Sequence, residues 1–240
     1  MYMLFFRKKE KKTPFVTAVI AAGGSSTRMG GENKLLMELD DRSVLAHTLL
    51  AFERCSSISE IIISAKSDMI VPYSNLAAEL GIKKLKCVVA GGSTRCESVY
   101  AGACQASPES KYIAVHDGAR PLIRPEEIAQ VCEKAIVYSA AAAAVPVKDT
   151  IKRVEDNRIK ETVDRSSLVA MQTPQVADKA LLLSALKNAL DLGLNVTDEC
   201  MALEAMHVKP VIVTCSYENI KITTPEDILF ARAVLAQREE

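Results

Sequence analysis

Short apolar runs rich in β-branched residues recur along the first half of the chain, and amphipathic segments separate them. Such runs predict strands buried on both faces, and they occupy residues 16–20, 61–64, 86–90 and 112–116. Between them, Ser43 precedes a helical pattern over 44–52, and a second helical segment around 76–80 ends at Gly81. This alternation predicts a mostly parallel sheet with helices on both faces, whose ligands bind beyond the carboxyl ends of the strands.

The second half of the chain continues this α/β pattern. Apolar spacing and capping residues predict a helix at 125–138, a strand of small residues at 140–147, a helix at 178–192, a short helix from Thr197 and a strand at 210–215. The sequence TPED begins a last helix, with Thr224 as its cap and Pro225 in the first helical position.

One segment departs from the pattern. Apolar and charged residues alternate over 148–165 around the turn formers Glu155, Asp156 and Asn157, which predicts a β-hairpin arm. Residues 173–175, Thr-Pro-Gln, are interpreted as the end of this excursion. An isolated two-stranded hairpin is marginal in water, so we expect a partner surface. The simplest partner is the arm of a second copy, which predicts a homodimer.

Composition narrows the class of protein. The 240 residues and a hydrophobic share of 49% fit a single α/β domain at 14–240, preceded by a disordered tail at 1–13. Basic and acidic residues balance at 30 each, so no global field predicts a nucleic-acid or membrane partner. The seven cysteines contain no C-x-x-C pair, which argues against a disulfide framework or zinc site and fits a cytoplasmic protein.

The first predicted strand runs into AAGGSSTRMG, residues 21–30, with Lys34 shortly after it. Gly23 and Gly24 give the backbone access to positive φ and to a close-lying ligand. Arg28 and Lys34 place two cations at the rim, and both suit phosphate oxygens. The loop matches neither G-x-G-x-x-G nor the P-loop pattern. It therefore predicts a phosphate cradle of another kind, with an ordinary basic turn as the alternative.

Two further turns are predicted at the same edge of the sheet. GGSTRCES, residues 91–98, is either a second wall of a nucleotide site or a plain helix start capped by Ser93. HDGARP follows the fourth strand, and its Asp117 is a candidate ligand of Mg²⁺, which favours one or two carboxylates plus substrate phosphates. The alternative is a turn from Asp117 to Arg120 that caps the next helix. His116 is interpreted as structural.

Taken in order, these motifs resemble the sugar and polyol phosphate nucleotidyltransferases, most closely the cytidylyltransferases of the non-mevalonate isoprenoid pathway. The similarity runs from about Thr17 to Leu235 and rests on AAGGSSTRMG with Lys34, GGSTRCESV, HDGARP, PVKDTIK, TVDR, TPQ, VTDE and NIKITTPEDI. It implies a Rossmann-like nucleotidyltransferase fold and transfer of CMP from CTP to 2-C-methyl-D-erythritol 4-phosphate, with release of pyrophosphate. It also implies Mg²⁺ as cofactor and a homodimer whose arm reaches the other subunit.

The resemblance implies a role for each motif. Nucleotide-binding residues would be Ala21, Ala22, Gly23, Gly24, Gly92, Ser93 and Ser98. Catalytic cations would be Arg28 and Lys34 on the triphosphate and Lys221 at the phosphate under attack. Asp117 would carry the metal, and the polyol phosphate would be held by Thr150, Arg165 and Thr173. Ser93 stands where many relatives have an aspartate.

The chemistry agrees with such residues and leaves three alternatives. An acceptor phosphate is already ionised, so in-line attack needs fixed cations rather than a nucleophilic serine or cysteine. A closely similar enzyme could act on another polyol phosphate, such as ribitol 5-phosphate. A non-catalytic nucleotide-binding protein could keep the same fold. A Rossmann oxidoreductase is the third alternative, but the chain lacks G-x-G-x-x-G and an acidic residue placed for a ribose.

Overall fold

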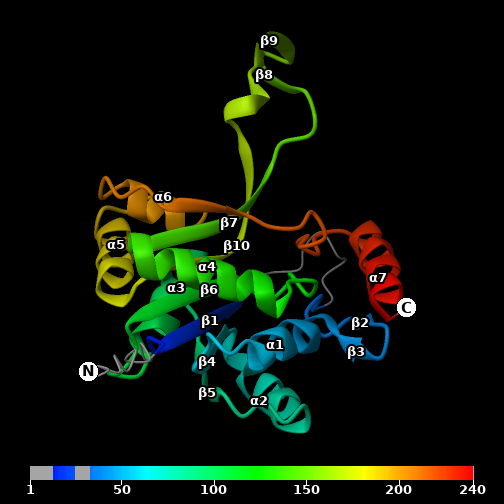
Figure 1. The fold of residues 1–240 in the computed structure, drawn as a ribbon, viewed down its shortest axis with the longest axis vertical. Coiled ribbons are helices and arrows are strands. Elements are labelled where there is room, and N and C mark those ends of the chain that lie inside the picture. Colours follow the sequence, from blue (N-terminus) through cyan, green and yellow to red (C-terminus); the bar gives the residue numbers. More distant parts are fainter. Residues whose placement is uncertain (1–12, 25–32, 240) are drawn as a thin grey trace, which may run out of the picture.

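The computed structural model describes residues 13–24 and 33–239. These residues form a seven-stranded sheet in the order β11-β7-β10-β6-β1-β4-β5, with helices packed around it (Figure 1). The pairings of the large sheet are parallel except that β10 runs antiparallel to both of its neighbours. This arrangement confirms the predicted α/β class with a mostly parallel mixed sheet.

The elements have the following bounds. The large sheet contains β1 (Val16–Ala22), β4 (Glu60–Ala65), β5 (Leu85–Ala90), β6 (Tyr112–Asp117), β7 (Ala140–Pro146), β10 (Val169–Asp178) and β11 (Val211–Thr214). Short pairs are formed by β2 (Glu38–Leu39) with β3 (Arg42–Ser43) and by β8 (Ile151–Glu155) with β9 (Arg158–Val163). The α-helices are α1 (Val44–Arg54), α2 (Ile70–Glu79), α3 (Arg95–Cys104), α4 (Pro125–Tyr138), α5 (Lys179–Asp191), α6 (Glu199–Glu204) and α7 (Pro225–Glu239).

The central strand β1 shows why helices cover both faces of the sheet. Every residue from 16 to 20 has 0% exposure. Ala18 and Ile20 belong to one core, which α1, α2, α4 and α7 cover, whereas Val19 belongs to a second core under α3, α5 and α6. Because side chains alternate across a strand, an unbroken apolar run such as this one needs apolar partners on both sides.

Strand β10 is the main departure from the sequence prediction. Residues 173–175 do not merely end the arm, because they lie in the middle of a ten-residue strand between β6 and β7. Pro174 has no N–H to give to a neighbour, and it is tolerated where the pairing with β7 shifts register between Met171 and Gln175. The arm therefore connects β7 to β10, two strands in the interior of the sheet, and not two edge strands.

The starts of two helices differ from those that the sequence predicts. Thr94, not Ser93, caps α3, and its hydroxyl accepts a hydrogen bond from the Glu97 N–H at 3.1 Å. Helix α6 begins at Glu199 rather than at Thr197, and Asp198 caps it by accepting from the Met201 N–H at 2.9 Å. Two other expectations fall outside the described residues: the tail as far as residue 12, and Arg28.

The arm residues form a hairpin that extends away from the body of the molecule (Figure 1). Its turn is made by Asp156 and Asn157, both with positive φ, 50° and 59°, as a two-residue hairpin turn requires. Cross-strand polar pairs such as Arg153 to Glu161, at 2.6 Å, link its two strands. Among the described residues, no helix is both long and apolar enough to cross a bilayer.

Candidate active site

The turns that follow β1, β5 and β6 meet at one edge of the sheet and enclose a cleft of about 630 Å³. Most of the residues that the sequence assigns to nucleotide, catalytic or metal roles line it, namely Ala21, Gly23, Gly24, Lys34, Gly92, Ser93, Ser98, Asp117 and Lys221. Ala22 is buried beside them at the end of β1. The cleft lies where an open α/β sheet binds its ligands, beyond the carboxyl ends of the strands.

The glycines of the second turn allow close packing, and no described glycine of either turn has positive φ. The described glycines with positive φ are Gly81 and Gly193, so this part of the prediction for Gly23 and Gly24 is wrong. A Cβ at Gly92 would collide with the Glu97 side chain, and one at Gly91 would lie 2.5 Å from the Ser98 hydroxyl. A Cβ at Gly24 would meet nothing within 4 Å, so there the missing side chain leaves the cleft open.

Glu97 holds the second turn in place. Its Oε2 accepts hydrogen bonds from the Ser93 N–H at 2.6 Å, the Ser93 hydroxyl at 2.7 Å and the Thr94 N–H at 3.2 Å. These bonds to the charged form lower the pKa of the Glu97 carboxyl. Ser98 closes the same turn from the helix by donating to the Thr94 carbonyl at 2.8 Å. The turn is therefore pre-organised before any ligand arrives.

Asp117, the last residue of β6, is surrounded by cations. Its Oδ1 lies 3.2 Å from Nη2 of Arg95, and its Oδ2 lies 2.9 Å from Nζ of Lys221 and 3.6 Å from Nε of Arg120. Burial alone would raise the pKa of the Asp117 carboxyl, but Arg95 and Lys221 outweigh burial and hold that pKa well below its usual range. Asp117 is therefore a carboxylate at neutral pH.

Arg95 and Glu199 were not identified from the sequence, yet they complete this cluster. Arg95 directs its Nε and Nη2 at Asp117 and gives two hydrogen bonds to Glu199, at 2.6 and 3.1 Å. Glu199 begins α6, and its side chain is only 2% exposed. The acidic start of a helix is an ordinary sequence feature, so only the contact across 104 residues reveals the pair.

Behind Asp117, His116 and Thr173 fix the position of its backbone. The Asp117 N–H donates to the Thr173 hydroxyl oxygen at 3.1 Å, and that hydroxyl lies 3.0 Å from Nδ1 of His116. Burial lowers the pKa of His116 to about 3, and its Nε2–H donates to the Arg120 carbonyl. Neutral Nδ1 is then the acceptor of the Thr173 hydroxyl proton. Both side chains are buried, and Thr173, which is predicted to hold the polyol phosphate, does not line the cleft.

The cations Lys34 and Lys221 are brought together by the segment before α7. Lys34 donates from Nζ to the Ile222 carbonyl at 2.8 Å, and the Ile222 N–H donates to the Ala119 carbonyl at 2.8 Å. Asn219 is fixed by its bond to the Thr173 carbonyl at 2.9 Å. The segment thereby carries Lys221 to Asp117 and ties the first glycine loop to the turn after β6.

Thr150 and Arg165 lie apart from the cleft of their own chain. Both are exposed at the base of the arm, and neither lines the cleft. Arg165 donates from its guanidinium group to the Lys148 carbonyl, and Lys148 in turn stacks its ammonium group 3.4 Å from the centre of the Tyr217 ring. The structure thus anchors the arm base but does not bring these two predicted acceptor-binding residues to the nucleotide turns.

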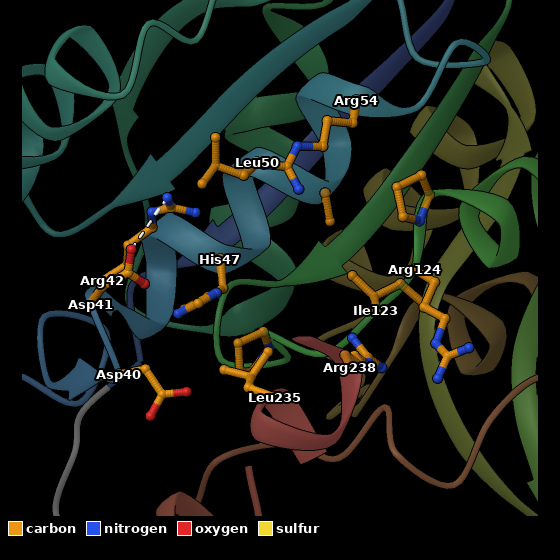
Figure 2. A pocket seen from close by; sticks show the side chains of 13 residues that line it. Asp40, Asp41, Arg42, His47, Leu50, Arg54, Ile123, Arg124, Leu235 and Arg238 are labelled. Atoms are coloured by element: carbon orange, nitrogen blue, oxygen red, sulfur yellow. Dashed lines mark ion pairs between the residues drawn. The ribbon is translucent and has the colours of Figure 1, made fainter. Parts of the chain in front are cut away.

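A second cavity lies elsewhere, between α1, the turn before α4 and α7 (Figure 2). It measures about 280 Å³ and contains none of the predicted site residues. Its charges largely pair among themselves or with a neighbour: Arg42 contacts Asp41 at 3.3 Å, and Arg124 and Arg238 share Glu218 at 2.8 and 2.6 Å. In the cleft at the sheet edge, the cations around Asp117 outnumber the carboxylates. This cleft is therefore the stronger candidate for the functional site.

An open, mostly parallel sheet whose carboxyl edge carries two glycine turns, an ionised aspartate and several cations defines a nucleotide-binding protein of the α/β class. Comparison with known proteins narrows this class to the nucleotidyltransferases. Residues 16–237 match the family described as IspD, 2-C-methyl-D-erythritol 4-phosphate cytidylyltransferase, and the chain belongs to that family.

Individual relatives agree. The chain is 42% identical over 224 residues to the 2-C-methyl-D-erythritol 4-phosphate cytidylyltransferase of Halalkalibacterium halodurans, covering 93% of this chain and 98% of the relative. It is 41% identical over 230 residues to the protein of the same name from Desulforamulus reducens, covering 93% and 97%. The crystal structure of 4-diphosphocytidyl-2C-methyl-D-erythritol synthase from Anaerococcus prevotii superposes with a TM-score of 0.84 at 31% identity, covering 93% and 97%.

Proposed function

We propose that this protein transfers a cytidylyl group from CTP to 2-C-methyl-D-erythritol 4-phosphate, giving 4-diphosphocytidyl-2-C-methyl-D-erythritol and pyrophosphate. Family membership over residues 16–237 supports this reaction. The structural observation that carries it is the cleft of about 630 Å³ in which two glycine turns face Asp117, Lys34 and Lys221. This arrangement can hold a nucleoside triphosphate and supply fixed positive charge where phosphorus is attacked.

The chemistry needs little covalent participation by the protein. An oxygen of the acceptor phosphate attacks the α-phosphorus of CTP, a new P–O bond forms, and the bond to the β-phosphate oxygen breaks in line with it. Pyrophosphate leaves with both electrons of that bond. Charge accumulates on the non-bridging oxygens, and we propose that Lys34 and Lys221, which line the cleft, stabilise it. Arg28, which lies outside the described residues, would add a third cation on the triphosphate.

Asp117 fits a magnesium ion of the kind that nucleotides bring. In the described part of the chain, no group of three or more His, Cys, Asp or Glu side chains could hold a metal by itself. Mg²⁺ commonly binds one or two carboxylates together with substrate phosphates, and the Asp117 carboxylate is ionised and faces the cleft. When bound, the ion would neutralise phosphate charge and orient the α-phosphate.

The test of this function is release of pyrophosphate from CTP in the presence of different acceptors. We expect release with 2-C-methyl-D-erythritol 4-phosphate and Mg²⁺, with the cytidylyl product identified by mass spectrometry. Release with ribitol 5-phosphate instead would assign a different acceptor. Binding of CTP without release in a single turnover would identify a nucleotide-binding protein without catalytic activity.

We further propose a cytoplasmic location, which the free cysteines support, and a homodimer, which the arm supports. Val154 and Ile159 face each other across the hairpin and are 58% and 68% exposed. A ribbon of two strands cannot bury such side chains by itself. A two-fold contact between two arms is self-complementary and closes after two chains. Since Thr150 and Arg165 lie at the base of the arm, we propose that they hold the acceptor phosphate in the cleft of the other subunit.

Shortening the arm should separate the two substrates. Replacing residues 152–161 by a short glycine-serine turn is expected to give a folded monomer that still binds CTP but has lost most of its affinity for the polyol phosphate. Sedimentation and titration of each substrate measure the two effects. As a control, Arg153→Ala with Glu161→Ala removes an exposed ion pair of little energetic value and should leave the dimer intact. A shortened protein that remains a dimer and binds the acceptor normally would contradict the proposal.

A further inference from the structure

Glu199 is a buried carboxylate for which the proposed reaction has no direct use. Its side chain is 2% exposed and it does not line the cleft. Its hydrogen bonds come from Nη1 and Nη2 of Arg95, a two-pronged contact at 2.6 and 3.1 Å. Burial raises the pKa of the Glu199 carboxyl, and the Arg95 guanidinium group opposes that rise, so Arg95 is the partner that stabilises Glu199 in its charged form.

Arg95 connects this buried carboxylate to the cleft. Its Nε and Nη2 lie 3.3 and 3.2 Å from Oδ1 of Asp117, so one guanidinium group serves two carboxylates. The cluster contains three cations, Arg95, Arg120 and Lys221, against the two carboxylates. If Glu199 were neutral, Asp117 would be left alone among three positive charges.

This charge count matters because Asp117 is the group proposed to meet a metal ion. A divalent cation approaching Asp117 is repelled by Arg95, Arg120 and Lys221, and the repulsion falls when one of these charges is offset. Arg95 has a second carboxylate partner, Glu199. Arg120, apart from its contact with Asp117, donates instead to backbone carbonyls such as that of Asn219, at 2.8 Å. Arg95 can therefore keep its contacts with Glu199 when Asp117 turns to another partner.

We infer that Glu199 is a positioning residue that acts through Arg95: it offsets and holds the Arg95 guanidinium group, and so lets Asp117 accept a divalent cation together with the nucleotide. The inference rests on the proposed function, because it supposes a nucleotide that arrives with its metal. It adds a residue that touches neither substrate nor cleft. It also predicts effects of opposite sign for Glu199 and for Arg95.

The experiment measures metal binding rather than turnover. Binding of Mn²⁺ to the full-length protein is followed by electron paramagnetic resonance at saturating CTP. Glu199→Gln keeps the size of the side chain but removes its charge, and it should weaken Mn²⁺ binding by about 10 to 100-fold, the usual loss when a group behind a metal ligand is removed. Arg95→Gln should bind Mn²⁺ at least as tightly as the parent. The double variant should recover most of the affinity that Glu199→Gln loses.

The controls separate this role from a merely structural one. Glu204→Gln makes the same change at an exposed position at the other end of α6 and should bind Mn²⁺ like the parent. A structural role for the pair predicts instead that Arg95→Gln also weakens binding and that the double variant is no better than Glu199→Gln. Either result, or unchanged binding by Glu199→Gln, would overturn the inference. Failure of the parent to release pyrophosphate would refute the proposed reaction, yet Mn²⁺ binding with CTP would still test Glu199.

Discussion

Replacing Asp117 by asparagine is expected to reduce turnover by about 1,000-fold, which corresponds to the several kcal/mol that a metal ion contributes to a phosphoryl-type transition state. The substitution preserves shape and removes the negative charge that faces the cleft between Arg95 and Lys221. Pyrophosphate release at increasing Mg²⁺ measures the effect. We expect partial rescue at high Mg²⁺, because the nucleotide phosphates still bind the ion.

Loss of stability must be separated from loss of chemistry in this variant, since removing one partner of a buried ion pair also destabilises a fold. Glu60→Gln is a matched control. Glu60 is buried and hydrogen-bonded to Thr17 at 2.9 Å, but it lies at the start of β4, the opposite end from the cleft. It should lower the melting temperature and leave turnover near that of the parent. An Asp117→Asn protein with normal melting and unchanged metal dependence would assign Asp117 to the turn alone.

The second large effect is expected at Lys34. Lys34→Ala should lower turnover by roughly 100 to 1,000-fold, the loss seen when one transition-state donor is removed, while CTP binding falls less. The reason is that charge on the departing pyrophosphate and the α-phosphate oxygens grows only as the bond breaks. Single-turnover pyrophosphate release and equilibrium titration of CTP measure the two quantities separately.

Lys34 also ties its loop to the Ile222 carbonyl, so the control must lose a similar tether without losing a charge in the cleft. Lys86 provides it. Its Nζ donates to the Gln105 carbonyl at 2.8 Å, the same length as the bond from Lys34 to Ile222, but at the amino end of β5. Lys86→Ala should turn over like the parent. A Lys34→Ala protein within about tenfold of the parent would remove this lysine from transition-state stabilisation.

The sequence predicted the elements that can be recognised from their own apolar pattern, without knowledge of what they pack against. Helix α4 has the predicted bounds, and the predicted strand at 16–20 corresponds to β1. Strand β10 was missed because Pro174 breaks the local pattern, and its place between β6 and β7 depends on partners far away in the chain. When only the sequence is read, a proline argues against a central strand, because it cannot donate a hydrogen bond to a neighbouring strand.

The site shows the same division. The glycine turns, Lys34, Asp117 and Lys221 stand in recognisable motifs, and the structure brings them to one cleft. Arg95 and Glu199 each occupy the first turn of a helix, where charged residues are common on exposed faces. Glu199 meets Arg95 only in the folded chain, where α6 packs against α5 and α5 against α3, and no local spacing encodes that contact. Thr173 belongs to a motif that was noticed in the sequence, and its hydroxyl accepts the Asp117 N–H, whereas its contact with the polyol phosphate stays a prediction.

The arm is a separate two-stranded sheet inserted between β7 and β10, and this has a consequence for hydrogen exchange. The last sheet pair before the arm, Pro146 with Val169, closes before β8 begins, and β8 and β9 pair only with each other. Their amide hydrogens can therefore exchange through local opening while the sheet stays intact. Deuterium uptake should be fast in the arm of a dilute protein and slow wherever a second chain covers it. Deuterium uptake by the arm therefore reports whether the dimer forms, independently of the stability of the core.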